Sequence, residues 1–374
     1  MKQRALLIIL CTLIEIIDFS FQNFVYHPYT WLREIRQLQN SSDCNDNCFQ
    51  GQLEHDFLIW RQKGRIDYES FQATYKHGIH YQIINGKIYR QELCLFPSRC
   101  TGIEYFLKLF ARDLPNTEFV LNVHDHPKVS KYSEPIPLFS FSKSNREIDI
   151  LYPAWSFWAG GPSIQTEPSG LGRWDLKIGS IRESAFRTPW ADKKNVGFFR
   201  GSRTSSERDP LIMLSREKPH LIEARYTKNQ AWKSSKDTLG LDPAEIVTFE
   251  QHCPYKYLFN FRGVAASFRL RHLFLCESLV LHVGEDWIEF FYPELIPWFH
   301  YIPVSTSLEE VEDLLKFLQE NDEIVEIIAR NGKKFIEEHL KMEDVTNYWR
   351  RIILAYSELI TWSVVRDDGL ILIT

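Results

Sequence analysis

The sequence lacks the features of several large classes of protein. It has no basic tail and a formal net charge of −5 over 374 residues, so the broad positive surface of a nucleic-acid-binding protein is not expected. No internal repeat or low-complexity run is present. The apolar run within residues 1–14 is too short to span a bilayer comfortably. A nucleotide is therefore more plausible as a small-molecule substrate than as part of a nucleic acid.

Common motifs for metal and dinucleotide binding are also missing. There is no Asp-x-Asp, the arrangement by which many nucleotide-sugar enzymes hold a divalent metal. The cysteines lack the paired two-residue spacing of zinc ribbons. The glycine-rich stretch 168–175 lacks the third glycine of the dinucleotide fingerprint and follows no strand directly, so a mobile substrate-contacting loop is the better interpretation. Arginines and backbone amides would then have to neutralise a diphosphate.

The first residues predict a secretory signal peptide over about residues 1–22. A positive start precedes an apolar run that Glu15 interrupts. An uncleaved anchor is the alternative, because no small-x-small cleavage site follows Ile17. Loss of the signal would remove Cys11 and leave six cysteines, an even number that predicts three disulfides in a secreted protein, with metal ligation as the weaker alternative. These are Cys44, Cys48, Cys94, Cys100, Cys253 and Cys276.

The order of the expected elements predicts an α/β fold. The chain exceeds what one hydrophobic core usually organises, so two domains of roughly 150 to 200 residues are expected, with a ligand in the cleft between them. Asn85-Gly86 between two apolar runs is the strongest hairpin signal. Helices and strands alternate elsewhere. We expect strands at 118–123, 138–142, 196–200, 222–226, 278–283 and 300–304, and helices at 102–113, 265–276, 307–320, 322–338 and 343–361.

Arginines follow a predicted buried strand within 195–209. Residues 196–200 suit a strand, and Gly201 lets the backbone turn close to a ligand. Arg200, Arg203 and Arg208 offer planar, charged groups for phosphate oxygens. A cluster of surface ion pairs is the alternative.

A second strand exit, residues 261–271, leads into the predicted helix 265–276. Unpaired amides at the helix start, the hydroxyl of Ser267 and the charge of Arg269 could meet a diphosphate. The alternative is that Ala265 and Ala266 only permit close packing, with Arg269 and Arg271 in surface ion pairs. Two such exits in one chain favour a nucleotide diphosphate held between them.

A polar cluster, Asn122-Val-His-Asp-His-Pro127, ends an apolar strand, where α/β sheets place reacting groups. Asp125 could take a proton from an incoming hydroxyl if it stays ionised and within hydrogen-bond reach. Two alternatives remain. His124 and His126 flank Asp125 as metal ligands would, although no third ligand is evident, or the whole set is a satisfied turn before Pro127.

Several long motifs resemble the Rumi-type protein O-glucosyltransferases, which move glucose from UDP-glucose onto a serine of epidermal-growth-factor-like (EGF-like) repeats. The resemblance extends from about residue 44 to residue 356. The matching stretches are 94–100 (CLFPSRC), 152–158 (YPAWSFW), 170–175 (GLGRWD), 199–204 (FRGSRT), 226–233 (YTKNQAWK), 255–269 (YKYLFNFRGVAASFR) and 282–284 (HVG).

Outside these motifs, a capping box at Ser307–Glu310 predicts the start of the helix 307–320.

This resemblance implies a GT-B fold, two Rossmann-like domains facing a central cleft, and an inverting transfer that needs no metal or other cofactor. It implies that Asp125 deprotonates the acceptor serine, and it implies the disulfides Cys94–Cys100 and Cys253–Cys276. The implied UDP-sugar-binding residues are Ser202, Arg208, Val264, Ala265, Ala266, Ser267, Phe268 and Arg269. The implied acceptor-binding residues are Leu95, Phe96, Pro97, Ser98, Arg99, Pro168, Ser169, Gly170, Leu171, Gly172, Arg173 and Trp174.

The expected domain order is a signal (1–22), an acceptor-side domain (23–190), a nucleotide-sugar-binding domain (191–342) and a C-terminal helix packing back toward the first domain (343–374). Asn40-Ser-Ser42 is the only N-glycosylation motif. Relatives can carry a cysteine near the last helix, where this chain has Asn347. One disulfide bond between the two ends of the chain is therefore expected to be missing. The end of the chain, 369–374, has no Lys-Asp-Glu-Leu-like signal.

The sequence therefore predicts a UDP-glucose:protein-serine O-glucosyltransferase of the endoplasmic reticulum lumen, acting as a monomer on folded EGF-like repeats such as those of Notch-type receptors, with no membrane span after signal removal. Two alternatives stay open. The same enzyme could use UDP-xylose, because a pocket discriminates poorly against one missing hydroxymethyl group. A catalytically silent chaperone that binds the same repeats is the other.

Overall fold

The computed structural model describes residues 28–44, 48–161, 171, 173–229 and 232–373. Helix α2 (Pro28–Leu38) belongs to a separate unit that ends at Asn40, and the second unit runs from Ser41 to the C-terminus. The predicted signal peptide lies outside the described residues. Within the described ranges, no helix combines the length and the apolar character needed to cross a membrane.

The first sheet of the second unit is mixed and has six strands. Its hairpin turns at Asn85 and Gly86, which have positive φ values of 48° and 73°, so the predicted hairpin is confirmed. β1 pairs antiparallel with β2 and β3, while β3, β4 and β5 are parallel. The spatial order is β11 (Ile371–Ile373), β2 (Lys87–Arg90), β1 (Ile79–Ile84), β3 (Thr117–Leu121), β4 (Leu138–Ser140) and β5 (Ile150–Leu151).

The second sheet has five strands and is parallel throughout. Its central strand β8 (Tyr255–Phe261) is buried at every residue, as expected of a strand covered on both faces. The order is β10 (Ile302–Val304), β9 (Leu279–Val283), β8, β6 (Lys194–Gly201) and β7 (Ile222–Tyr226). With two sheets and intervening helices, the predicted α/β class is confirmed, although only the second sheet is purely parallel.

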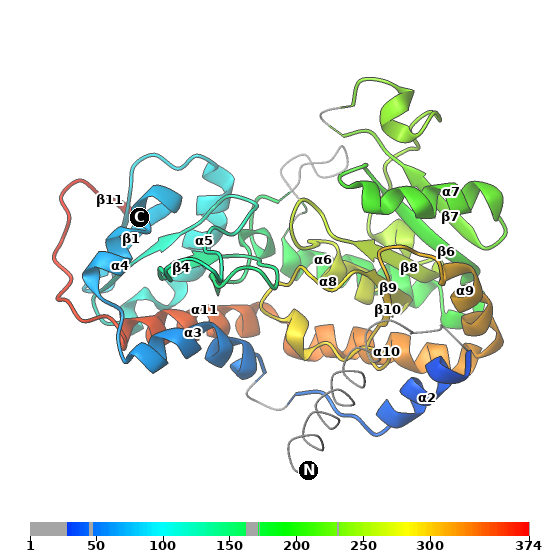
Figure 1. The fold of residues 1–374 in the computed structure, drawn as a ribbon, viewed down its shortest axis with the longest axis horizontal. Coiled ribbons are helices and arrows are strands. Elements are labelled where there is room, and N and C mark those ends of the chain that lie inside the picture. The colour runs from blue at the N-terminus through cyan, green and yellow to red at the C-terminus, as the bar shows by residue number, and fades with distance from the viewer. Residues whose placement is uncertain (1–27, 45–47, 162–170, 172, 230–231, 374) are drawn as a thin grey trace, which may run out of the picture. The chain divides into compact units, whose positions relative to one another are not determined.

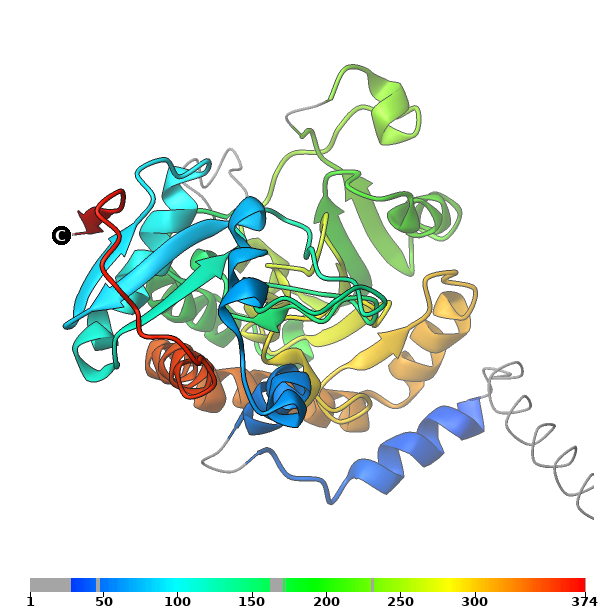
Figure 2. The ribbon, with the colours of Figure 1, turned by 60° about the vertical axis from the view of Figure 1, so that its left-hand side comes forward.

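Helices connect and flank the sheets (Figures 1 and 2). The second half continues through α9 (Val311–Glu320) and α10 (Asp322–His339), and α10 contacts β9 and α8. The next helix, α11 (Met342–Ser357), instead contacts α3 and α5 of the first half. The other helices are α3 (Gln50–Lys63), α4 (Tyr68–Gln72), α5 (Pro97–Phe110), α6 (Trp174–Arg187), α7 (Asp209–Glu217) and α8 (Leu270–Phe274).

Two predicted helices begin later than expected. The helix predicted at 265–276 is only α8, which starts at Leu270, so residues 263–269 form a turn and not a helical first turn. The helix predicted at 307–320 starts at Val311, because Leu308 has a positive φ of 61°. The carboxylate of Glu310 accepts hydrogen bonds from the backbone N–H and the hydroxyl of Ser305 at 2.6 and 2.7 Å, so the predicted Ser307–Glu310 capping box is wrong.

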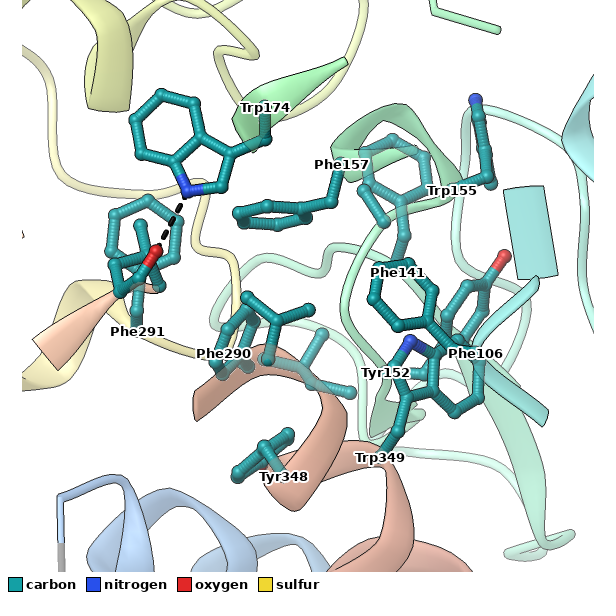
Figure 3. Close-up of a cluster of buried hydrophobic side chains, with 14 of the residues drawn as sticks. Phe106, Phe141, Tyr152, Trp155, Phe157, Trp174, Phe290, Phe291, Tyr348 and Trp349 are labelled. Carbon is teal, nitrogen blue, oxygen red and sulfur yellow. Dashed lines mark hydrogen bonds between the residues drawn. The ribbon is translucent and has the colours of Figure 1, made fainter. Parts of the chain in front are cut away.

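One buried hydrophobic cluster contains residues from both halves (Figure 3). Phe106 of α5 and Trp155 of the first half share it with Phe290 of the second half and Trp349 of α11. Because both sheets contribute to the same core, that core supports the loop that carries Asp125 and the arginine-rich segments after β6 and β8.

The predicted number of three disulfides is confirmed, as are the implied pairs Cys94–Cys100 and Cys253–Cys276, and the third pair is Cys44–Cys48. Cys253–Cys276 joins the residues before β8 and before β9. The ammonium of Lys193, next to β6, donates to the carbonyl oxygens of Cys253 at 2.5 Å and Cys276 at 3.0 Å. Burial lowers the pKa of Lys193 to about 8.

Candidate active site

The loop that carries Asp125 is built around Asn122, which is fully buried at the end of β3. The side-chain amide of Asn122 donates to the carbonyl oxygen of His126 at 2.8 Å and to the hydroxyl of Ser140 at 2.9 Å. Its amide oxygen accepts from the backbone N–H of His124 at 2.9 Å. The loop therefore curls around one buried side chain, with Asp125 on its outer side.

Buried Asp149 holds the other end of this loop. Its carboxylate accepts from the backbone N–H groups of Lys128 and Val129 at 3.0 and 2.8 Å, and from the hydroxyl of Ser140 at 2.6 Å. Burial raises the pKa of Asp149. Sequence reasoning did not identify Asn122 and Asp149 as the supports of the loop, although an aspartate in the apolar run 148–151 was a signal.

The Asp125 side chain is 42% exposed and forms an ion pair with Arg99. Nη2 of Arg99 donates to Oδ1 of Asp125 at 2.9 Å, and Nη1 donates to the carbonyl oxygen of Val123 at 2.5 Å. A carboxylate with this partner and this exposure is placed to meet an incoming hydroxyl, which is what the prediction of a base requires.

The histidines beside Asp125 point to aromatic neighbours. The ring of His124 contacts Phe96 edge-on at 5.8 Å, and that of His126 lies 6.0 Å from Trp287. Burial lowers the pKa of His124, and the nearby charge of Lys128 acts in the same direction. Neither histidine belongs to any group of described residues close enough to bind a metal; those groups are Cys44, Cys48 and His339, with the cysteines disulfide-bonded, and Asp43, Glu338 and His339.

Arg208 lies buried behind the exit of β6, at the end of a single 3-10 turn (Ser206–Arg208). Nη1 donates to the carbonyl oxygen of Ser202 at 2.5 Å and to the hydroxyl of Thr204 at 3.2 Å, while Nη2 donates to the carbonyl oxygen of Arg262. Its Nε is buried without a partner. Burial lowers the pKa of Arg208 to about 10. The segment after β6 and the segment after β8 are thus joined by one guanidinium.

Arg269 reaches the same place from the segment after β8. Its Nη1 donates to the carbonyl oxygen of Arg200 at 2.7 Å, and its Nη2 is buried without a partner. Burial and the charge of Arg208 lower the pKa of Arg269 to about 9. Gly201 lies against both guanidinium groups, because a Cβ there would be 3.1 Å from Nη1 of Arg269 and 3.7 Å from Nη1 of Arg208.

Within the described ranges, neither Arg208 nor Arg269 has a carboxylate within ion-pair distance, whereas the other two arginines of the β6 exit do. Arg200 pairs with Glu223 at 2.6 Å, and Arg203 pairs with Asp209 through two contacts of 2.8 and 2.5 Å. Buried positive charge without a counter-ion is costly. An anionic ligand at Arg208 and Arg269 would remove that cost, and a diphosphate fits it.

The segment 263–269 combines features of both interpretations made from the sequence. Ala265 and Ala266 are buried, as close packing requires, while Val264 is 44% exposed. The backbone N–H of Ser267 donates to the hydroxyl of Tyr292 at 3.2 Å, and the Ser267 hydroxyl donates to the side-chain oxygen of Asn260 at 2.6 Å. The N–H and the hydroxyl of Ser267 are therefore both occupied within the protein, and the positive charge of this segment comes from Arg269.

Residues predicted to bind the acceptor divide into two groups. Leu95, Pro97 and Ser98 are exposed, and Leu95 keeps 57% of its surface. Phe96 and Arg99 are half-buried and contact the loop that carries Asp125, Phe96 through His124 and Arg99 through Asp125 itself. A series of contacts connects this loop to the segment after β8. The Arg99 guanidinium lies 4.4 Å from the centre of the Trp155 ring, and that ring lies 6.0 Å from the ring of Phe268, which directly precedes Arg269.

The second predicted acceptor stretch is only partly described. Pro168, Ser169, Gly170 and Gly172 lie outside the described residues. Leu171 and Trp174 are buried, and the indole N–H of Trp174 donates to the carbonyl oxygen of Leu340 at 2.7 Å (Figure 3), so in this structure these two side chains belong to the core and not to an acceptor surface. Arg173 is exposed, pairs with Asp175 and lies over the ring of Trp158 at 4.1 Å.

Known proteins resemble this chain over most of its length. Residues 39–374 match the family model described as Glycosyl transferase family 90. The chain is 51% identical to human Protein O-glucosyltransferase 1 over 341 residues, covering 89% of this chain and 86% of that protein. It is 47% identical to O-glucosyltransferase rumi of Drosophila melanogaster over 337 residues, covering 89% and 81%. The Anabaena Alr3699/HepE structure with UDP and glucose is distant, at 14% identity and a TM-score of 0.34, covering 49% of this chain and 54% of that one.

Proposed function

The chain belongs to the Rumi-type protein O-glucosyltransferases of glycosyl transferase family 90, as its motifs predict, and we propose that it transfers glucose from UDP-glucose to a serine hydroxyl of EGF-like repeats. One observation carries the proposal at the level of the site. Asp125 pairs with Arg99, whose guanidinium lies over the ring of Trp155. Trp155 contacts the ring of Phe268, which directly precedes Arg269. Arg269 and Arg208 have no carboxylate partner among the described residues, and each has one buried nitrogen without a hydrogen-bond partner.

These groups supply the two halves of an inverting transfer. Asp125 takes the proton of the serine hydroxyl as the serine oxygen bonds to the anomeric carbon of glucose. The bond from that carbon to the diphosphate oxygen breaks on the opposite face, and its electron pair leaves with UDP. Arg208 and Arg269 stabilise the negative charge that develops on the diphosphate. This scheme assigns no step to a metal.

The remaining donor contacts are proposed for the segments next to these arginines. Ser202 presents a half-buried hydroxyl 3.3 Å from that of Thr204. Val264, Ala265, Ala266, Ser267 and Phe268 form the turn that leads to Arg269. The absence of large polar side chains between 264 and 266 lets the turn approach a ligand through its backbone.

The acceptor surface is proposed to be the loop Leu95–Arg99 together with the exposed part of the 168–174 stretch. Exposed Leu95 supports this assignment, because an exposed apolar side chain beside a reactive carboxylate suits a protein substrate. Leu171 and Trp174 act on this surface only by supporting it from the core.

Three disulfides support an oxidising compartment, so we place the protein in the endoplasmic reticulum lumen as a monomer that could carry a glycan at Asn40, an exposed residue. The proposed boundary between the acceptor-side and donor-side domains near residue 190 is supported by the sheets, since β1–β5 precede it and β6–β10 follow it. The proposed C-terminal extension 343–374 is supported by the contacts of α11 with α3 and α5.

The test is to incubate the purified protein with one folded EGF-like repeat and, separately, UDP-glucose and UDP-xylose. A product heavier by one hexose, formed by the parent and not by Asp125→Asn, supports the proposal. A pentose product would replace glucose by xylose as the donor. Binding of the repeat without turnover of either donor would instead indicate a silent chaperone. Thermal stabilisation of Asp125→Asn by UDP is the control that the variant keeps its donor site.

A further inference from the structure

The guanidinium of Arg99 is mostly buried and binds the loop that carries Asp125, hereafter the base loop. We propose that Arg99 is a positioning residue that orients the Asp125 carboxylate for proton abstraction. The inference rests on the proposed function, because it assumes that Asp125 is the base. It changes the role expected from the family resemblance, in which Arg99 was an acceptor contact.

The guanidinium of Arg99 is held in a narrow slot. Its central carbon lies 4.3 Å from the centre of the Phe96 ring and 4.4 Å from that of the Trp155 ring. Only 19% of the side chain is exposed, and Trp155 is fully buried. A planar cation between two rings keeps its orientation, which an ammonium group on a flexible stem would not.

The two nitrogens at the tip of Arg99 bind the base loop at two points. Nη1 donates to the carbonyl oxygen of Val123 at 2.5 Å, and Nη2 donates to Oδ1 of Asp125 at 2.9 Å. This pair of bonds fixes the carboxylate relative to its own backbone. In the part of the chain that the structure describes, no other residue donates a hydrogen bond to Asp125, so Oδ2 stays available for the serine hydroxyl.

The loop that delivers Arg99 is itself restrained. Arg99 lies in the first turn of α5 and directly precedes Cys100, which is bonded to Cys94. The backbone N–H of Arg99 donates to the carbonyl oxygen of Phe96 at 2.9 Å. A side chain supported by a helix start and a disulfide holds its partner more accurately than one on a free loop.

The experiment compares Arg99→Met, Arg99→Lys and the parent with UDP-glucose and a folded EGF-like repeat. Methionine fills the slot between the rings without charge. We expect kcat to fall by about 10- to 100-fold in Arg99→Met, with the KM for UDP-glucose unchanged. Arg99→Lys should restore only part of kcat, because an ammonium group on a flexible stem does not hold one orientation between the rings.

Arg90→Met is the matched control. Nε of Arg90 donates to the carboxylate of Glu104 at 2.6 Å and Nη1 donates to the carbonyl oxygen of Glu92 at 2.7 Å, and 15% of the side chain is exposed. This arginine therefore makes the same kinds of contact in the same half of the protein, but none to Asp125. Its loss should leave kcat close to that of the parent.

Two results would overturn the positioning role alone. One is an Arg99→Met variant with the parent's kcat. The other is a raised KM for the repeat with kcat unchanged, which would make Arg99 an acceptor contact. A parent that transfers no sugar would overturn the proposed function together with this inference. UDP-dependent thermal stabilisation of each variant confirms folding, and Arg99→Gln replaces Arg99→Met if methionine prevents it.

Discussion

Arg208 and Arg269 come from segments that follow different strands, and their guanidinium groups lie over the same aromatic ring, that of Phe199, at 5.5 and 4.9 Å from its centre. Each has one nitrogen that is buried without a hydrogen-bond partner. Two like charges so placed repel each other, and the protein bears that cost in the absence of a bound anion. The proposed donor site therefore contains two cations that repel each other.

Arg269→Met should weaken donor binding while leaving the protein at least as stable. Loss of one charge-assisted contact with a diphosphate is worth roughly 1.5–3 kcal/mol, or about 10- to 100-fold in the KM for UDP-glucose. Removal of one of two repelling charges offsets the lost bond to the carbonyl oxygen of Arg200. Titration with UDP and thermal unfolding without ligand measure the two effects.

Arg203→Met is the control for this prediction. Arg203 follows the same strand, but its guanidinium is engaged by the carboxylate of Asp209. An equal loss of donor affinity in both variants would show that general positive charge, and not the unpaired arginines, determines binding.

The Glu289 carboxyl should make stability depend on pH. Glu289 is fully buried, 3.8 Å from Arg271, and burial raises its pKa from 4.5 to about 7. Between these two values the folded protein holds a proton at this site that the unfolded chain has lost. The free energy of unfolding therefore falls as pH rises from about 4.5 to 7, by at most about 1.4 kcal/mol per pH unit.

Glu289→Gln should remove this contribution. Denaturant unfolding at pH 5, 6 and 7 would then give a flatter dependence in Glu289→Gln than in the parent, whatever the absolute stabilities. The same exchange at Glu320, which is exposed at the end of α9, is the control. A slope that Glu289→Gln leaves unchanged would show that Glu289 is ionised throughout, paired with Arg271.

The Cys94–Cys100 disulfide should matter more for catalysis than for stability. Both this bond and Cys44–Cys48 close short loops, with separations of 6 and 4 residues, so each should contribute about 2 kcal/mol through the unfolded chain. Only Cys94–Cys100 restrains the loop that carries Phe96 and Arg99.

Replacement of Cys94 and Cys100 by alanine should therefore lower kcat/KM for the repeat by about tenfold or more, because the groups around Asp125 lose their fixed geometry. The double variant of Cys44 and Cys48 should lose similar stability and keep its activity. Thermal midpoints and initial rates separate the two. Equal rates in the two double variants would mean that the loop keeps its geometry without the bond.

Local signals in the sequence were enough for the strands and the hairpin, because β-branched runs and Asn85-Gly86 act over a few residues. They failed where distant groups decide. Residues 263–269 form a turn because the hydroxyl of Tyr292 accepts from the N–H of Ser267 and donates to its carbonyl oxygen. β11 was missed because its partner, β2, lies far back in the chain.

The candidate site shows the same division. Asp125 could be proposed from its position after a strand, and the arginines after β6 from their glycine-containing neighbourhood, whereas the family resemblance singled out Arg208 among them. That Arg200 is occupied could not be seen from the sequence, because its partner Glu223 belongs to another strand. The contact between Arg99 and Asp125 spans 26 residues and depends on how the start of α5 lies against the loop that follows β3.

Gly201→Ala should weaken donor binding by crowding alone. A Cβ at this position would lie 3.1 Å from Nη1 of Arg269 and 3.2 Å from the ring of Phe199, closer than most real contacts. One of the two groups must move, and a displaced guanidinium loses its alignment with the diphosphate. We expect the KM for UDP-glucose to rise by about tenfold, with a loss of stability of about 1 kcal/mol or more from overpacking.

Gly179→Ala in α6 is the matched control, since a Cβ there meets nothing within 4 Å and alanine stabilises a helix interior by about 0.8–1.0 kcal/mol relative to glycine. Opposite shifts in thermal midpoint, with donor affinity changed only at residue 201, are the expected result. Unchanged donor affinity in Gly201→Ala would mean that the turn after β6 is not in contact with the nucleotide.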